Sequence, residues 1–244
     1  MNPLLIIDLG LITYSDAYSL QQRIATARKV NAIEDVLLLC EHPPVVTLGR
    51  NGKRDNLLVS ASVLRQKNIE FHETNRGGDI TYHGPGQIVG YPILDLSRIK
   101  RDVHWYVRTL EEVMIRATAD FGITAYRVPG KTGIWVAATP AEEKLAAIGV
   151  HLSRWVTSHG FAYNVATDLR NFDLIIPCGL TGSRATSLEK LLNRSVPLSE
   201  AKPHLIGHFA ELFNSEPVPL ARETFLSQLA HHENSATTHV VADL

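Results

Sequence analysis

Short apolar runs dominate the first hundred residues of the chain. Runs of this kind, bounded by Gly, Pro or charged residues, are typical of buried strands, and strict alternation is typical of half-buried ones. The expected strands are residues 4–9, 35–40, 45–48, 69–73 and 88–96. After the first strand, apolar residues recur at helical spacing, which predicts a helix that is capped by Ser15 or Asp16 and ends near Lys29. A shorter helix is expected at residues 60–67.

The second half begins with a long amphipathic helix. Asp102 is its expected cap, Gly122 its expected end, and Met114 lies in its apolar stripe, which makes Met114 a core residue. The pattern then changes to strands and later back to helices. The expected strands are 124–128, 133–138, 144–152 and 160–165, and the expected helical segments are 168–172, 187–192, 199–213 and a last turn or two at 224–229. The polar end from His231 is expected to be frayed.

This order of elements predicts an α/β fold in which helices flank a mixed sheet. The sequence contains no internal repeat, low-complexity segment or convincing linker. We therefore expect a single domain over residues 1–215, with a helical C-terminal lobe from about residue 187. Residues 216–244 are expected to form a partly frayed C-terminal extension.

Composition and charge narrow the classes of partner. The 244 residues include 24 basic and 25 acidic side chains, for a net charge of −1. Nucleic acids and anionic membranes need a basic face, so neither is the expected partner. The N-terminus lacks the basic and apolar parts of a signal peptide, and no segment reaches the ~20 apolar residues that span a bilayer. Two cysteines without a CxxC pairing predict a cytoplasmic protein with reduced thiols.

Glycines concentrate in residues 76–96, which carry five of the sixteen in the chain. Glycine is favoured where the backbone takes a positive φ or closely approaches another group. Here the glycines alternate with Arg76, Asp79, Tyr82 and His83, ahead of an apolar strand that would support the loop. This arrangement favours the wall of a binding site, because rigidly mounted loops often carry function. The alternative is a hairpin connection without a ligand.

Cys178 is the sharpest candidate for chemistry. Pro177 cannot donate to a sheet ladder and Gly179 permits a tight turn, so the thiol is expected at the end of an element. A cysteine on a bend, near exposed backbone N–H groups, suits an acyl-transfer nucleophile with an oxyanion site. A structural turn cysteine fits these residues equally well. Cys40, at the end of an expected core strand, is expected to be a small buried hydrophobe.

A nucleophilic cysteine needs a group that holds it as a thiolate near neutral pH. Histidine is the commonest partner, and His83, His151 and His159 are available. Lys144 is the other option, because it opens an apolar, small-residue strand where a merely solvated charge is unusual. At ~4 Å and an effective dielectric near 20, an ammonium would favour the thiolate by about 4 kcal/mol before desolvation. Spacing alone does not choose between lysine and histidine.

The motifs together resemble the octanoyltransferases of lipoate biosynthesis, also called lipoyl(octanoyl) transferases or the lipoate-protein ligase B family. The resemblance covers about residues 35 to 190, with order and spacing intact. Its motifs are Arg76-Gly77-Gly78 through Thr81-Tyr82-His83-Gly84-Pro85-Gly86-Gln87, Lys144 with Ala147-Ile148-Gly149, His159-Gly160, and Pro177-Cys178-Gly179.

The resemblance implies a fold like that of biotin protein ligases and lipoate ligases, and a catalytic pair. Cys178 would form the acyl thioester and Lys144 would lower the pKa of its thiol. The implied substrate-binding residues are Arg76, Gly77, Gly78, Asp79, Ile80, Thr81, Tyr82, His83, Ala147, Ile148, Gly149, Gly160, Phe161 and Ala162. His83 could either order its loop or hydrogen-bond the acyl carbonyl.

The implied reaction needs no cofactor, because the octanoyl group arrives as a thioester on the phosphopantetheine of acyl carrier protein. The implied acceptors are lipoyl domains of 2-oxoacid dehydrogenase E2 subunits and the glycine cleavage H protein, and a monomer is expected. Arg50, Lys53 and Arg54 are candidate docking charges for acidic partners.

Three other interpretations remain open at this level. An ATP-dependent lipoate or biotin ligase could share the fold, but it would not need the Pro-Cys-Gly motif. A non-catalytic module that binds carrier proteins could keep the fold, although it would not need Cys178 and Lys144 together. A zinc site built from Cys178 and histidines lacks the usual ligand spacing.

Overall fold

The main layer of the molecule is a large mixed sheet. The computed structural model describes residues 1–176 and 184–241, with side chains to Asn234. In this part of the chain, eight strands follow the order β12-β1-β2-β6-β10-β9-β8-β7, and β11 pairs with β9. Their bounds are β1 Asn2–Leu11, β2 Asp35–Glu41, β6 Gln87–Ile93, β7 Ala125–Val128, β8 Lys131–Val136, β9 Glu143–Ser153, β10 Val156–Asn164, β11 Arg184–Ala185 and β12 Ser215–Pro219. Parallel pairs at β12-β1-β2 and antiparallel pairs from β2 to β7 confirm the predicted mixed sheet.

A second, three-stranded sheet was not predicted. It has the order β4-β3-β5, with β3 Val45–Leu48, β4 Glu70–Glu73 and β5 Ile80–His83. Residues 84–86 therefore lead from β5 in the small sheet to β6 in the large one, and they do not close a hairpin. Periodicity identifies strands but not their partners, so the sequence could not separate the two sheets.

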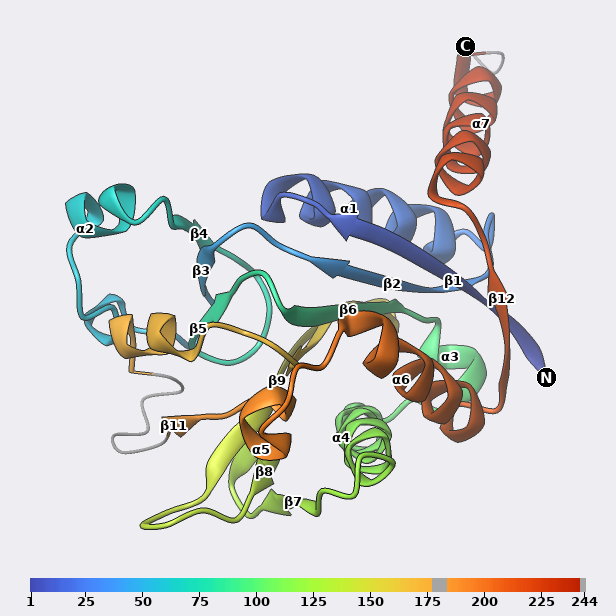
Figure 1. The fold of residues 1–244 in the computed structure, drawn as a ribbon. Helices are drawn as coiled ribbons and strands as arrows, with labels where there is room; N and C mark the ends of the chain where they lie inside the picture. Colours follow the sequence, from blue (N-terminus) through green and yellow to red (C-terminus); the bar gives the residue numbers. More distant parts are fainter. Residues whose placement is uncertain (177–183, 242–244) are drawn as a thin grey trace.

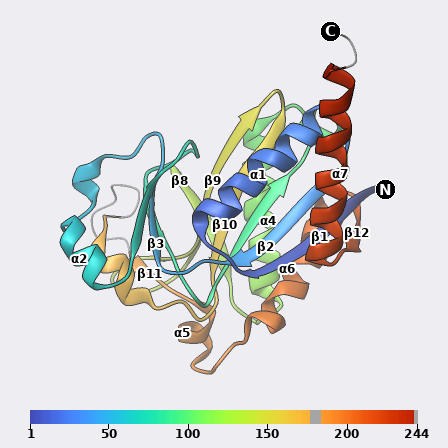
Figure 2. The same cartoon turned by 90° about the horizontal axis from the view of Figure 1, so that it is seen from above.

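Helices cover both faces of the large sheet (Figures 1 and 2). On one face, α1 (Tyr14–Lys29) and α7 (Arg222–Val241) pack against Val36, Leu38 and Cys40 of β2. On the other, α4 (Val103–Ala119) and α6 (Leu198–Leu212) pack against Leu37 and Leu39. Successive strand residues point to opposite faces, so the apolar run of β2 serves both cores. The shorter elements are α2 Ala61–Gln66, α3 Leu96–Ile99, α5 Leu188–Leu192 and the 3₁₀ turns η1 Arg54–Asn56 and η2 Leu169–Leu174.

Several predictions about single residues can be checked. Cys40 and Met114 are fully buried, which confirms both as core residues. Asp102 caps α4, because its side chain accepts from the Trp105 N–H at 2.9 Å. The predicted cap of α1 is wrong: Thr13, not Ser15 or Asp16, accepts from the Asp16 N–H at 3.2 Å, so the helix begins earlier.

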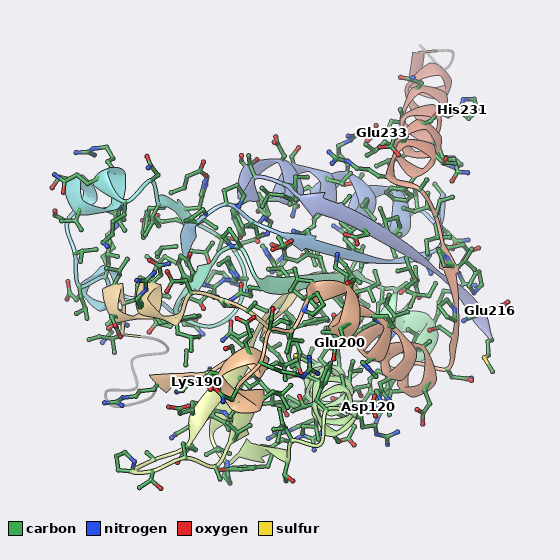
Figure 3. The ribbon with its side chains drawn as sticks, viewed as in Figure 1. Asp120, Lys190, Glu200, Glu216, His231 and Glu233 are labelled. Atoms are coloured by element: carbon green, nitrogen blue, oxygen red, sulfur yellow. The ribbon has the colours of Figure 1, made fainter. Side chains whose placement is uncertain are left out.

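The C-terminal region is more regular than expected. β12 pairs with β1 and spans the predicted boundary at residue 215. α7 is helical through Val241, where a last turn or two followed by fraying was expected. Its buried Phe225 and Leu229 contact the α1 side of the core. Glu233, which is labelled on α7 in Figure 3, forms a 2.7 Å ion pair with Arg23 of α1. In the described part of the chain, no helix has the length and apolar character that crossing a membrane requires.

Candidate active site

A pocket lies between the small sheet and four adjacent strands of the large sheet. The space between its lining residues is about 910 Å³, which includes the part open to solvent. Most of the predicted substrate-binding residues line it. These are Arg76, Gly78, Asp79, Ile80, Thr81, His83, Ala147, Ile148, Gly149, Gly160, Phe161 and Ala162, together with the predicted catalytic residue Lys144.

Strand register gives the pocket a narrow apolar floor. Across β6, β10 and β9, Val89 pairs with Ala162, and Ala162 pairs with Ala147. In the next row, Gly160 of β10 pairs with Gly149 of β9. Opposed residues of one sheet face are neighbours, so these small side chains leave a continuous apolar channel. Such a channel suits an unbranched acyl chain.

The glycine-rich loop approaches the floor closely. The Gly77 N–H donates to the Val150 carbonyl at 2.8 Å, which ties the loop to β9. A Cβ at Gly149 would lie 2.7 Å from the Gly77 carbonyl oxygen, so only glycine permits this approach. On its other side the loop is held by Asp79, which accepts 2.7 Å and 2.5 Å hydrogen bonds from the Ile80 N–H and the Asn56 side chain. Asp79 thus orders the loop.

Arg76 places a buried cation in the pocket wall. The residue is 7% exposed, and its guanidinium donates to the Thr47 carbonyl at 2.7 Å and to the Thr47 hydroxyl at 2.9 Å. A third donation, at 3.0 Å, goes to the Gly77 carbonyl. The planar fork of arginine matches this set of acceptors, which fixes its direction. The arginine therefore joins the small sheet to the glycine-rich loop.

His83 is held on both ring nitrogens. Its Nδ1–H donates to Gln87 Oε1 at 2.7 Å, and its Nε2 lies 3.4 Å from the Thr47 hydroxyl. Gln87 in turn donates to Asn164 Oδ1 at 2.9 Å, so the network reaches β10. Burial, with His42 and Arg76 nearby, lowers the pKa of His83 to about 3. Of the two roles left open for His83, this geometry favours the ordering of the loop.

His159 is the second buried histidine of the pocket. It has a left-handed backbone (φ 54°), and its N–H donates to Gln21 Oε1 of α1 at 2.8 Å. Its Nε2 bonds Asn75 Oδ1 at 2.7 Å, which assigns the proton to Nε2 because a carbonyl oxygen only accepts. Burial and the charge of Arg76 lower the pKa of His159 to about 3. The ring is therefore neutral at physiological pH.

These two histidines predict that acid destabilises the fold. Their pKa in the folded state lies below the unfolded value of about 6.5, so between these values the unfolded chain binds protons that the folded chain does not. The free energy of unfolding should fall by about 1.4 kcal/mol per pH unit for each histidine as the pH drops below 6.5. Urea denaturation at pH 7, 6 and 5 measures this slope. His159→Gln should reduce it by about 1.4 kcal/mol per pH unit, and equal slopes would contradict the prediction.

Lys144 stands at the edge of the pocket beside an indole. In the ladder between β8 and β9, Lys144 is directly opposite Trp135. Its Nζ lies 5.0 Å from the centroid of the Trp135 ring, and both residues line the pocket. The backbone of Lys144 is fixed on its other side by β11 and by the Thr186 N–H, which donates to the Lys144 carbonyl at 2.9 Å.

Cys178 lies outside the described residues, as do Pro177 and Gly179. The described residues on each side of this segment are held by different parts of the chain. The Ile176 N–H donates to the Asn56 carbonyl at 2.8 Å, and Asn56 bonds Asp79. Arg184 pairs with Glu143, directly before Lys144.

Two of the predicted substrate-binding residues do not line the pocket. Gly77 binds Val150 through its backbone, as described above. The Tyr82 ring points into the core behind the small sheet, where it packs edge-on against Phe172 and its hydroxyl accepts from Asn171 at 3.0 Å. Alternation along β5 explains this, because Thr81 and His83 face the pocket. Both residues support the wall from behind.

Several residues of the pocket were not among the predicted site residues. Tyr14 enters from the start of α1, and its ring stacks 6.3 Å from the ring of His83. The others are Gln87, Val89, Tyr91, Trp135, Ala146, His159, Asn164, Phe172, Arg184 and Ala185. Gln87 and His159 belong to the motifs of the resemblance, and His159 was also a candidate partner of the thiol. Trp135 carried a further signal, because its strand is the expected neighbour of the strand of Lys144. Among the residues with described side chains, no group of three His, Cys, Asp or Glu could hold a metal ion.

The sequence matches a known protein family. The sequence profile of the lipoyl protein ligase A/B catalytic domain matches residues 13–210. The chain is 54% identical to the octanoyltransferase of Solibacter usitatus (strain Ellin6076), over 86% of this chain and 93% of that one.

Solved structures identify the fold. A bi-partite lipoate protein ligase from Thermoplasma acidophilum superposes with a TM-score of 0.71 at 17% identity, covering 94% of this chain and 91% of that one. The biotin protein ligase of Aquifex aeolicus superposes with a TM-score of 0.51 at 12% identity, over 88% and 71%. The predicted fold is confirmed. The chain belongs to the lipoyl protein ligase A/B catalytic family and, within it, to the octanoyltransferases.

Proposed function

We propose that this protein transfers an octanoyl group from octanoyl-acyl carrier protein to a lysine of lipoyl domains, the first step in the lipoylation of these domains. One observation carries the proposal: Lys144 lines the same pocket as an apolar floor made of alanine and glycine. A floor of this kind suits an unbranched acyl chain, and in the proposed reaction Lys144 would act beside the acyl carbonyl. The name of the Solibacter relative supports the same activity.

Cys178 and Lys144 would share the chemistry in two steps. First, the Cys178 thiolate attacks the thioester carbonyl, a new C–S bond forms, and the pantetheine thiolate leaves and takes a proton from the Lys144 ammonium. Then the neutral Lys144 amine takes a proton from the attacking lysine of the lipoyl domain. The amide forms, the Cys178 thiolate leaves, and the original ion pair is restored. Exchange between thioesters is nearly isoenergetic, and amide formation drives the second step.

The pocket supports this division of roles. Arg76 and His83 are engaged by Thr47 and Gln87, and His159 is engaged by Asn75, so these groups serve as fixed walls. Described residues next to the segment that contains Cys178 are held by Asn56, which bonds the pocket residue Asp79, and by Glu143, which directly precedes Lys144. A donor that is already a thioester needs no nucleotide activation, so the proposed reaction has no cofactor. We place the reaction in the cytoplasm, where thiols stay reduced.

The experiment that tests the function compares two acyl donors. The purified protein is mixed with a lipoyl domain and either octanoyl-acyl carrier protein without ATP, or octanoic acid with ATP and Mg²⁺. Intact-mass measurement of the lipoyl domain detects the amide. We expect transfer from the carrier protein only. Transfer that requires ATP would identify a ligase instead, and stable binding of both partners with no product would identify a non-catalytic module.

A further inference from the structure

The side chain of Lys144 rests on a face built by β8. Trp135 is fully buried and pairs with Lys144 across the β8–β9 ladder. The lysine Nζ lies 5.0 Å from the centroid of the indole ring, within the range of a cation–π contact. Indole is the best partner among the aromatic side chains, and the contact strengthens when water is excluded. The ring can therefore fix the place of the ammonium.

Gly133 makes room for the stem of the lysine. The residue has a φ of 112°, and a Cβ built on it would lie 3.0 Å from Lys144 Cε and 2.3 Å from the Ala146 carbonyl oxygen. A side chain at this position would displace the lysine or the strand. Gly133 and Trp135, two residues apart on β8, therefore form the surface against which the Lys144 side chain lies.

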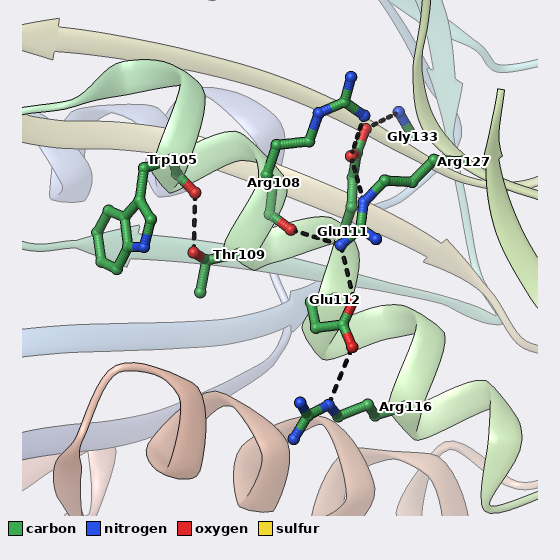
Figure 4. Close-up of polar contacts among 8 residues, drawn as sticks. All are labelled: Trp105, Arg108, Thr109, Glu111, Glu112, Arg116, Arg127 and Gly133. Carbon is green, nitrogen blue, oxygen red and sulfur yellow. Dashed lines mark hydrogen bonds and ion pairs between the residues drawn. The ribbon is translucent and has the colours of Figure 1, made fainter. Parts of the chain in front are cut away.

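A buried carboxylate on α4 fixes this part of β8. Glu111 of α4 is fully buried, and its Oε1 accepts from the Gly133 N–H at 3.0 Å. Its Oε2 accepts from Arg108 at 2.7 Å and from Arg127 at 3.0 Å, as Figure 4 shows. Partners on both oxygens hold a buried carboxylate in one orientation. Gly133 is therefore fixed by a group that does not reach the pocket.

We propose that Trp135 is the positioning residue of Lys144: its indole face holds the lysine ammonium at the pocket edge, on a strand that Glu111 anchors through Gly133. This inference rests on the proposed function, in which Lys144 stabilises the Cys178 thiolate. Trp135 acts on the reaction through Lys144. Removing the ring should remove this cation–π contact and should weaken the effect of the ammonium on the thiol.

Lys131 offers a matched control on the same ring. Its Nζ also lies 5.0 Å from the centroid of the Trp135 ring, but it forms a 2.7 Å ion pair with Glu142. Both lysines should therefore sense the ring, whereas only Lys144 should influence the thiol. Lys131→Met removes one cation from the ring and leaves Lys144 in place.

The contact itself can be tested by NMR, without any assumption about function. Reductive methylation with ¹³C-formaldehyde labels each lysine, and the ring current of an indole moves the methyl signal of a lysine that lies on its face. We expect displaced signals for Lys131 and Lys144, assigned by Lys131→Met and Lys144→Met, and both should return to the ordinary lysine position in Trp135→Leu. A Lys144 signal that is the same with and without the indole would overturn the proposal.

The consequence for chemistry is tested by the pH dependence of alkylation at Cys178. We expect the apparent pKa of its thiol to rise by about half a pH unit to one unit in Trp135→Leu, and to stay unchanged in Lys131→Met. Trp135→Phe keeps a ring in the core and should give a smaller rise, which covers the case in which the leucine variant does not fold.

Lys144→Met separates the two possible failures. If this variant raises the apparent pKa of Cys178 but neither Trp135 variant does, the inference about Trp135 is wrong and the proposed function stands. If Lys144→Met itself leaves the pKa unchanged, the role of Lys144 in the proposed function is wrong.

Discussion

In Cys178→Ala, incubation with octanoyl-acyl carrier protein is expected to leave the mass of the enzyme unchanged, whereas the wild-type protein gains one octanoyl group. The reason is that the proposed thioester forms on this thiol and alanine offers no nucleophile. Loss of a nucleophile typically costs at least about a thousandfold in turnover, so transfer to the lipoyl domain should fall below detection. Intact-protein mass spectrometry measures the adduct, and hydroxylamine should remove it from the wild-type protein.

Cys40 supplies the internal control. Its thiol is fully buried, and burial together with the nearby Asp8 carboxylate raises the pKa of Cys40 well above its usual range. A protonated, inaccessible thiol does not attack a thioester. Cys40→Ala should therefore keep the adduct and the activity. An adduct that persists in Cys178→Ala and disappears in Cys40→Ala would show that the nucleophile has been misassigned.

The sequence was most informative where a single strand decides the geometry. Lys144 was expected to open an apolar strand of small residues, and in the structure Ala147 and Gly149 of that strand pair with Ala162 and Gly160 of β10. Glycine content likewise indicated close approaches in the loop, and Gly149 against Gly77 is one of them. These features depend on residue size and on the alternation of residues along a strand, and both can be read directly from the sequence.

Contacts between distant segments could not be predicted in this way. Thr47 accepts hydrogen bonds from the guanidinium of Arg76, but nothing in the sequence distinguished it from any other residue of a short strand. Tyr14 reaches the pocket from the first turn of α1, and Gln21 of the same helix holds the backbone of His159. Such contacts follow from how sheets and helices pack, and no local pattern records them. His83 illustrates the limit: the sequence offered it as a possible partner of a thiolate, whereas its hydrogen bonds hold it as a neutral residue of the pocket wall.

Lys144→Arg is expected to cause a large loss of transfer while the fold is retained. Arginine keeps the positive charge, so a thiolate can still form beside it, but its guanidinium does not give up a proton at accessible pH. The variant should therefore accumulate some octanoyl thioester on Cys178 and fail at the second step, in which the amine of the lipoyl domain must lose a proton. General acid–base catalysis contributes about 10²- to 10⁴-fold, which is the expected loss in turnover.

Lys144→Met gives the comparison that makes this result specific. It removes the charge as well as the proton, so it should lose the thioester adduct and the transfer together. Circular dichroism and thermal melting would show whether both variants remain folded. Rapid mixing with octanoyl-acyl carrier protein, followed by addition of the lipoyl domain, separates the two steps by mass. If Lys144→Arg turned over at the wild-type rate, Lys144 would have no part in proton transfer, and its contribution would be charge alone.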